Sequence, residues 1–477
     1  MTAETDVLAG YPPEVPVDPR DVAASVAATG RVLVVLDDDP TGTQSVSDLP
    51  VLTRWEPEDF AWAFGTGAAA VYVLTNTRSL DPDEAAARNR EAVGNALTAA
   101  QEAGVALGFV SRSDSTLRGH YPLEPDVIAE TLAERTGEDV DGVVIVPAFP
   151  EAGRITVGGV HYTRDGHGGL VPVAETEFAQ DATFRYHHSE LARYVEEKSA
   201  GRFRAADVLV LDLHAVRGGA AGIADALEPA AHSTPVVVDI VTENDLRALA
   251  LGLAEAERRG KRLLYRVGPP FGRARLGQDE RPPLTGADIP AGGAGPGAVG
   301  GLVVVGSHVG LTTRQLENLT ARHRHATTVE LSVEAVLDPD RAEDHLAGTV
   351  DAVVAALAAG DVILHTSRLL VRAEDPAESL RIARTVSAAV VAVVNRTLKT
   401  SPPRFVVAKG GITSSDVAAH GLEIRHAMVR GPMLPGIVSL WEPVDGPARG
   451  IPYVVFAGNV GGDESLADVV AKLSSTF

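Results

Sequence analysis

Cysteine is missing from all 477 residues of the chain. Its absence excludes disulfide bonds, thiolate metal sites and cysteine nucleophiles from the fold and the chemistry. A chain without disulfides is typical of a reducing compartment, so we expect a cytoplasmic protein.

Long apolar runs are missing as well. The nearest candidate, residues 386–394, is much shorter than the ~20 residues that cross a bilayer, and arginines flank it. The first 20 residues are acidic and contain prolines, without the basic start and apolar stretch of a signal peptide. We expect them to form a loose N-terminal arm of a soluble protein that has no membrane partner.

Positive charge and aromatic side chains are scarce. The formal net charge is −22, and aromatic residues make up 5% of the chain. Phosphate backbones need a basic surface, and single strands also need stacked rings, so we do not expect nucleic acid as a partner. An anionic small molecule would have to be bound by locally placed arginines or lysines.

The chain is rich in short β-type runs that alternate with helical patterns. Most runs are apolar at consecutive positions, as in parallel strands buried on both faces. They lie at 31–36, 70–75, 105–111, 142–148, 207–213, 235–241, 262–267, 301–307, 361–367, 404–411 and 453–459. Helical patterns occupy 82–104, 242–260, 341–360 and 376–398, and Asp81 before Pro82, with Glu84 three residues on, marks one helix start. This alternation predicts an α/β fold.

The length of the chain exceeds one ordinary core. It predicts two domains, each with a largely parallel sheet flanked by helices. Between Arg281 and Gly301 the pattern gives way to prolines and glycines with little to bury. We therefore expect an arm (1–20), a first domain (21–282), a Gly/Pro-rich linker (283–300) and a second domain (301–477).

Charged and hydroxyl side chains follow the strand runs of the first domain. Ligands of open α/β sheets bind beyond the carboxyl ends of the strands. Guanidinium groups grip carboxylates at two points, while Asp, Ser and Thr bind sugar hydroxyls, so the set suits a small polyhydroxy acid. Taken singly, each residue fits a helix cap, a turn or a surface ion pair about as well. The whole set also includes Asp37, Ser113 and Arg154. The candidates chosen from it are Asp38, Asp39, Arg78, Arg112, Asp114, Ser115, Thr116 and Arg118.

The strand ends of the second domain carry glycines and small hydroxyls instead. Glycine lets backbone amides approach phosphate oxygens, and a helix that begins there adds its positive end. Glycine pairs after strands are common, so the small polar residues at neighbouring strand ends give this motif its weight. The candidates for a phosphate site are Ser307, Lys409, Gly410, Gly411, Thr413, Gly458 and Asn459.

Four segments together resemble the four-carbon acid sugar kinases, ATP-dependent enzymes that act on threonate-like and erythronate-like acids. DDPTGTQ (38–44) resembles their Asp-Asp-Leu-Thr-Gly-Ala opening, and SDSTLRGH (113–120) their Asp-Ser-Thr-Leu-Arg-Gly-Asn motif. PAFPEAGR (147–154) and GGITSSDV (410–417) resemble their Pro-Ala-Phe-Pro-x-x-Gly-Arg and Gly-Gly-Asp-Thr segments. The order is the same, and the resemblance spans nearly the whole chain.

The resemblance implies an acid-sugar-binding domain followed by a nucleotide-binding domain, with the active site in the cleft between them. It implies ATP and Mg²⁺, with the metal held by phosphates and waters and few protein ligands, so no residue is assigned to it. Asp39 would accept the proton of the attacking hydroxyl, and Asp38 would bind substrate hydroxyls.

Four positions depart from the family pattern and indicate a divergent branch: Pro40, His120, Ile412 and Phe456. Many members carry a lysine near position 456, and we expect Lys409 to compensate for it. The identity of the acid and the oligomeric state stay open; a homo-oligomer is compatible with the sequence.

Two other functions also stay open. An apolar strand followed by Asp37-x-Asp39-x-Thr41 resembles the opening of the haloacid-dehalogenase-like phosphatases. On that interpretation Asp37 is the nucleophile, Asp39 the acid/base and Asp463 a Mg²⁺ ligand. It leaves the other three segments without a role. The third hypothesis is a non-catalytic sensor that binds a sugar acid or a nucleotide.

Overall fold

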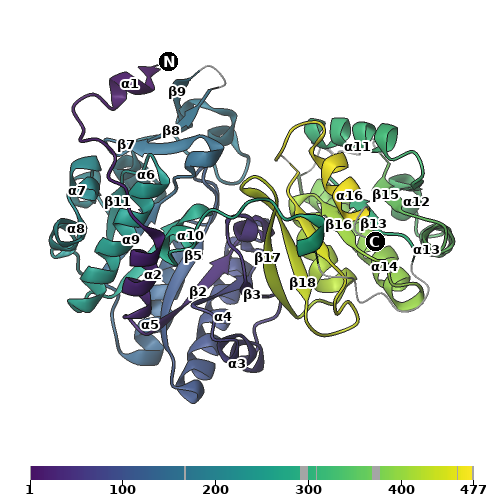
Figure 1. Ribbon diagram of the computed structural model, residues 1–477, viewed down its shortest axis with the longest axis horizontal. Coiled ribbons are helices and arrows are strands. Elements are labelled where there is room, and N and C mark those ends of the chain that lie inside the picture. The colour runs from purple at the N-terminus through teal and green to yellow at the C-terminus, as the bar shows by residue number, and fades with distance from the viewer. Residues whose placement is uncertain are drawn as a thin grey trace. The chain divides into compact units, whose positions relative to one another are not determined.

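The computed structural model describes residues 2–165, 168–289, 299–307, 309–367, 376–458 and 460–474. The chain divides into two compact units (Figure 1). Unit 1 comprises the chain up to Leu49 and Trp55–Glu280, and unit 2 comprises Pro50–Arg54 and the chain from Arg281 onward. None of the helices in the described ranges has the length and apolar composition needed to span a bilayer.

Unit 1 is built on a parallel sheet. Its strands lie in the order β10 (Leu209–Leu211), β11 (Thr234–Val238), β6 (Gly142–Val146), β12 (Leu263–Val267), β5 (Ala106–Arg112), β2 (Arg31–Asp37) and β4 (Ala70–Leu74). Each neighbouring pair runs parallel. Consecutive apolar residues are buried along β6, β12 and β4, which confirms the prediction of strands covered on both faces.

Two groups of helices cover this sheet (Figure 1). In the first, α4 (Pro82–Ala103) packs on α3 (Pro57–Gly65) and α5 (Leu123–Thr136). In the second, α2 (Pro19–Ala27), α7 (Leu213–Arg217), α8 (Ala220–Leu227) and α10 (Pro270–Arg275) all contact α9 (Glu243–Arg258). The predicted start of α4 is confirmed, because Asp81 caps it and accepts a hydrogen bond from Glu84 N at 2.9 Å.

A small antiparallel sheet in unit 1 was not predicted. Its order is β1 (Thr2–Ala3), β9 (Gly169–Pro172), β8 (Val160–Arg164) and β7 (Arg154–Val157), and α6 (Leu191–Lys198) follows it in the chain. The N-terminal segment, expected to be a loose arm, differs from that expectation. It adds β1 to this sheet, continues into α1 (Glu4–Val7), and pairs Glu4 with Arg164 at 2.7 Å.

Unit 2 has a sheet of mixed direction. β19 (Tyr453–Phe456), β16 (Val406–Lys409), β13 (Leu302–Val305), β15 (Val362–Thr366) and β14 (Thr327–Leu331) are parallel neighbours in that order. A hairpin of β17 (His426–Leu434) and β18 (Ile437–Pro443) adds antiparallel strands beside β19. The helices of this unit are α11 (Gly310–Arg322), α12 (Val333–Leu337), α13 (Ala342–Leu357), α14 (Pro376–Thr400), α15 (Gly411–Asp416) and α16 (Ser465–Ser474).

Two short segments belong to unit 2 although the sequence placed one in the first domain and one in the linker. β3 (Leu49–Leu52) leads to Thr53, whose backbone N donates to Arg425 O at 3.3 Å. Leu284 and Ile289 lie in the core of unit 2, because apolar side chains in the expected linker find a place to bury. Half of that linker, residues 290–298, lies outside the described residues.

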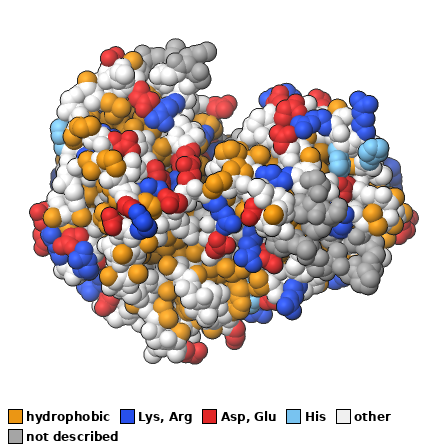
Figure 2. Space-filling model, in the orientation of Figure 1, with side chains coloured by type: hydrophobic (Ala, Val, Ile, Leu, Met, Phe, Trp, Pro, Cys, Tyr) orange, Lys and Arg blue, Asp and Glu red, His pale blue; other side chains and the backbone are white. Residues whose placement is uncertain are grey.

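Acidic and basic side chains are interspersed on the face shown in Figure 2. Where side chains are described there, this face offers no extended basic surface to a polyanion.

Candidate functional site

The acidic run after β2 turns into a short 3-10 helix, η1 (Pro40–Ser45). Asp39 caps this helix, because its carboxylate accepts hydrogen bonds from Thr41 N, at 2.8 Å, and from the Thr41 hydroxyl. Pro40 fits the first helical position since it has no N–H to leave unpaired. Asp39 keeps 18% of its side chain exposed, against 2% for Asp37 and 2% for Asp38.

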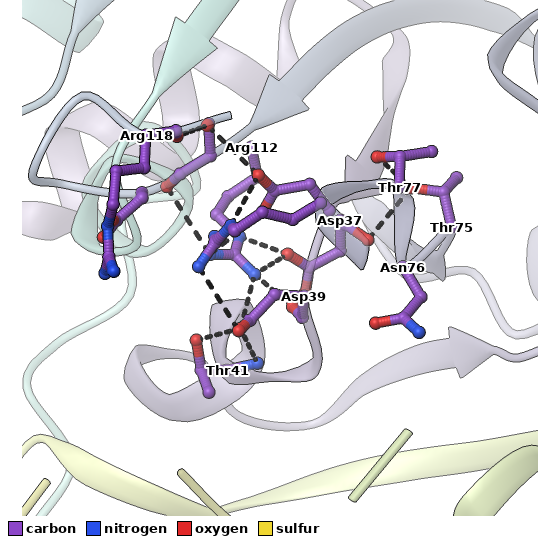
Figure 3. A network of polar contacts seen from close by, with 12 residues as sticks. Asp37, Asp39, Thr41, Thr75, Asn76, Thr77, Arg112 and Arg118 are labelled. Atoms are coloured by element: carbon purple, nitrogen blue, oxygen red, sulfur yellow. Dashed lines mark hydrogen bonds and ion pairs between the residues drawn. The ribbon is translucent and has the colours of Figure 1, made fainter. Parts of the chain in front are cut away.

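Arg112, at the end of β5, is buried among these acids. β2 and β5 are neighbours, and Asp37 is the register partner of Arg112. The guanidinium donates to the Asp37 carboxylate and to the Asp39 carbonyl, and its Nη1 lies 3.6 Å from Asp38 Oδ1 (Figure 3). Arg112 therefore holds the three acids together; direct contact with a substrate stays a prediction for it.

Arg78 reaches the acids from η2 (Thr77–Ser79), the turn after β4. Its Nη2 and Nε donate to the two oxygens of Asp38 at 2.6 and 3.1 Å, and its Nη1 lies 3.3 Å from Asp39 Oδ2. Backbone contacts fix this turn, since Arg78 N donates to Asp38 O at 3.2 Å. The result is a two-point ion pair whose guanidinium is 19% exposed.

The same surroundings shift the pKa values of Asp37 and Asp39 in opposite directions. Burial raises the pKa of Asp37 to about 7, although the Arg112 charge opposes this rise. Burial also opposes ionisation of Asp39, but the charges of Arg78 and Arg112 and the hydrogen bonds from Thr41 outweigh it and lower its pKa. Asp39 is thus a partly exposed carboxylate that is ionised at neutral pH.

The loop after β5 carries a second ionic group. Arg118 Nε donates to Asp114 Oδ2 at 2.6 Å, and the Thr116 hydroxyl donates to the same carboxylate. Burial is overcome by the charges of Arg78 and Arg118 and by these hydrogen bonds, which hold the pKa of Asp114 well below its usual range. Ser113 Oγ lies 3.1 Å from Asp38 Oδ2 and links the loop to the acids.

Side chains from later in unit 1 hold this loop from behind. His161 Nε2, on β8, lies 2.8 Å from Ser115 O, and the Tyr186 hydroxyl donates to Thr116 O at 2.8 Å. Ser115 is buried and enters the network through its carbonyl. Gly119 has a φ of +123°, and a Cβ there would crowd the Ser113 hydroxyl.

The predicted first-domain residues therefore come together at the ends of β2, β4 and β5 (Figure 3). Sequence reasoning had named Ser113 in the wider set at these strand ends, but it missed His161 and Tyr186. Neither of these two follows a strand of the parallel sheet, so no local pattern marks them.

The ends of β13, β16 and β19 form a second candidate site, in unit 2. Lys409 is the register partner of both Val305 and Phe456, so the residues that follow these strands leave the sheet side by side. A Cβ on Gly306 or Gly410 would collide with the Thr413 side chain, and one on Gly458 would lie 2.8 Å from Ser307 Oγ.

Four of the predicted residues thus meet at one point: Ser307, Gly410, Thr413 and Gly458. Gly411 opens α15 directly beside them. Asn459 lies outside the described residues. Glycines and small hydroxyl side chains at converging strand ends are the residues that a nucleotide phosphate site uses, so this group is a candidate for one.

Lys409 contacts the loop after β19 that carries Gly458. It is fully buried; its Nζ donates to Ala457 O at 2.5 Å and lies 4.0 Å from the centroid of the Phe456 ring. Burial lowers the pKa of the amine to about 7. Because Ala457 immediately precedes Gly458, the lysine fixes the loop that carries that glycine; contact with a nucleotide stays a prediction.

The other departures from the family pattern have different surroundings. His120 is buried, with Nε2 3.1 Å from both Thr77 O and Leu80 O, so it ties the end of the Asp114 loop to η2. Ile412 has 54% of its surface exposed.

The geometry does not favour the phosphatase hypothesis. Asp37, its nucleophile, is buried against Arg112, and Asp463, its metal ligand, pairs with Arg314 at 2.9 Å on the surface of unit 2. Within the described ranges, no group of three or more His, Asp or Glu side chains is arranged to hold a metal ion.

Comparisons with known proteins match both halves of the chain. A model of a sugar-binding N-terminal domain matches residues 33–275, and a model of a nucleotide-binding C-terminal domain matches residues 302–466. Two solved structures, from Salmonella typhimurium LT2 and Haemophilus influenzae, share the fold with TM-scores of 0.64 and 0.63 at 19% identity. They cover 91% and 93% of this chain, and 98% and 100% of their own.

Two curated relatives carry kinase names. A D-erythronate kinase of Heliobacterium modesticaldum is 28% identical over 317 residues, and a 3-oxo-tetronate kinase of Methylobacterium radiotolerans is 28% identical over 409 residues. The first match covers 65% of this chain but only 64% of that kinase, and the second covers 83% and 87%. With both domain models and both relatives in agreement, the chain belongs to the four-carbon acid sugar kinase family.

Proposed function

We propose that this protein is an ATP-dependent kinase that phosphorylates a hydroxyl of a small sugar acid. The observation that carries the proposal is the state of Asp39, a partly exposed carboxylate held ionised beside two guanidinium groups. Phosphoryl transfer asks the protein for positioning, charge stabilisation and a proton acceptor. Unit 1 supplies the proton acceptor and the polar groups that bind substrate hydroxyls. Unit 2 supplies a group of small residues that would bind the phosphates.

In this proposal each side chain has a defined task. Asp39 accepts the proton of the attacking hydroxyl through the part of its carboxylate that stays exposed, while η1 holds that carboxylate in place. Both carboxylate oxygens of Asp38 accept hydrogen bonds from Arg78, so Asp38 orients the Arg78 guanidinium. In this proposal the exposed part of that guanidinium faces the substrate. Asp114, Thr116 and Arg118 form the polar wall that selects hydroxyl positions.

The group of small residues in unit 2 would hold the nucleotide phosphates through backbone amides near Gly410 and Gly458. Mg²⁺, when bound with ATP, would neutralise charge on the transferred phosphoryl group. A position of the active site between the two domains stays a prediction.

ADP formation tests the proposal. Purified protein with ATP and Mg²⁺ would be assayed against stereoisomers of erythronate, threonate and 3-oxo-tetronate, with Asp39→Asn and the exposed control Asp207→Asn. We expect acceptor-dependent ADP with at least one acid, a loss of about 10²- to 10⁴-fold in Asp39→Asn, and no change in the control. No acceptor-dependent ADP across the panel, or full activity in Asp39→Asn, would reject the proposal or its assignment of the base.

A further inference from the structure

Arg154 is a partly buried arginine of unit 1 whose surroundings differ from those of Arg78, Arg112 and Arg266. It is the first residue of β7, its Nε is inaccessible to solvent, and no hydrogen-bond acceptor within the described residues pairs with that atom. By contrast, Arg78, Arg112 and Arg266 each form an ion pair with a carboxylate. A buried N–H donor without an acceptor, such as this Nε, is costly because it recovers none of the hydrogen bonds that water provided.

The neighbours of Arg154 place it at the substrate wall. Its guanidinium carbon lies 5.7 Å from the centroid of the Phe178 ring, and that of Arg118 lies 5.4 Å from the same centroid. Asp114, the carboxylate partner of Arg118, also acts electrostatically on Arg154. Arg154 therefore stands next to the residues that we assign to substrate.

The two guanidinium groups on Phe178 are not equivalent. Arg118 is occupied, since Nε donates to Asp114 at 2.6 Å and Nη1 lies 3.8 Å from Asp181. Arg154 has contact with the ring and no protein acceptor among the described residues. Burial lowers the pKa of Arg154, and Asp114 only partly offsets this effect, so an added anion would relieve an unfavourable state.

We propose that Arg154 binds the carboxylate of the acid substrate, with its planar fork paired to the two carboxylate oxygens. This inference rests on the proposed function, and it adds the feature that separates a sugar acid from a neutral polyol. Arg118 instead positions Asp114, which contacts the hydroxyls. The carboxylate end would thus be fixed at β7, and the chain of hydroxyls would extend toward Asp39.

The test compares binding of an acid with binding of its neutral analogue. Calorimetry without nucleotide would measure the Kd of the preferred acid and of the corresponding sugar alcohol for wild type, Arg154→Gln, Arg154→Lys and Arg118→Gln. We expect Arg154→Gln to weaken acid binding about 10- to 100-fold while alcohol binding changes by less than about twofold, since one charge-assisted pair is lost. Arg154→Lys should recover part of the acid affinity, because it keeps the charge and loses the fork.

Arg118→Gln is the matched comparison, and it should weaken acid and alcohol binding by similar factors. If Arg154→Gln lowers both equally, or neither, Arg154 does not bind the carboxylate and the inference is wrong, whether or not the protein is a kinase. If wild type binds acids over alcohols in an Arg154-dependent way and yet makes no ADP, the inference stands and the proposed function fails. Wild type that binds no acid of the panel overturns both.

A thermal unfolding scan of each variant accompanies these titrations. A lower Tm in Arg154→Gln, with acid and alcohol binding both lost, would assign the residue to folding and overturn the inference.

Discussion

Asp37 and Arg112 are register partners at the ends of the parallel strands β2 and β5, and their side chains form an ion pair that is 2% exposed on each side. A pair so deeply buried gains little over a well-packed apolar pair, but removal of one partner leaves an uncompensated charge. The same guanidinium also contacts Asp38 and Asp39. Arg112 therefore links the stability of unit 1 to the geometry of its candidate proton acceptor.

Arg112→Met should lower the free energy of unfolding by about 3–5 kcal/mol, because it leaves the buried carboxylates without their positively charged partner. Urea denaturation at pH 7 measures this loss. The double variant Asp37→Asn/Arg112→Met should recover part of it, since fewer buried charges lack a partner. Arg204→Met, at an exposed pair with Asp207, is the control and should leave the urea midpoint unchanged. Equal loss in the single and double variants would contradict the assignment.

The packing of Asp37 against Arg112 also depends on Gly42, because no larger side chain fits at that position. A Cβ at this position would collide with Arg112 Nε and with both oxygens of Asp37. Because that ion pair is buried and cannot swing into solvent, Gly42→Ala should destabilise the protein by about 1–3 kcal/mol. Gly65→Ala, at the end of α3 with nothing within 4 Å of the added Cβ, is the matched control. A Gly42→Ala midpoint equal to that of the control would refute the crowding argument.

His161 should make stability depend on pH. Burial lowers its pKa to about 4, while in the unfolded chain the value is about 6.5. Between these values the unfolded chain takes up a proton that the folded chain excludes, so stability falls as pH drops from about 6.5 to about 4. Its neutral form suits the contacts seen, with Nε2 2.8 Å from Ser115 O and Nδ1 3.0 Å from Thr156 Oγ1.

Urea titrations at pH 7 and pH 5 measure this effect. Wild type should lose about 2 kcal/mol more over that interval than His161→Gln does, a figure that follows from the two pKa values. His325→Gln, at an exposed histidine, should follow the wild-type dependence. The hypothesis fails if His161→Gln and wild type lose the same stability.

Lys409→Met tests the buried amine of unit 2. The methionine keeps the volume and contact with Phe456 but removes the donor to Ala457 O. We expect ATP affinity to fall about tenfold, because the loop that carries Gly458 loses its tether, while stability at pH 7 stays equal or rises since a desolvated amine is gone. Calorimetry with ATP and Mg²⁺ measures the affinity, and Lys399→Met on the surface is the control. Unchanged ATP affinity in Lys409→Met would show that the lysine serves packing alone.

The sequence by itself determined the fold class, because that information is local. Consecutive apolar residues specify strands buried on both faces, and helical periodicity between them specifies a parallel sheet. The residues at strand ends follow directly, which is why Asp38, Asp39, Gly410 and Gly458 could be named from spacing. β17 and β18 were not among the predicted strands, so the hairpin and the antiparallel part of the unit 2 sheet were not predicted.

Only the tertiary structure decided which of three consecutive acids faces solvent. Asp37, Asp38 and Asp39 are alike in sequence, and their burial depends on Arg112, which lies 75 residues after Asp37, and on Arg78. His161 reaches Ser115 from 46 residues away, through a sheet that no run predicted. The charge partners of a residue and its desolvation are properties of the folded protein, so the local sequence pattern does not predict them. For the same reason, the unpaired state of Arg154 could be found only in three dimensions.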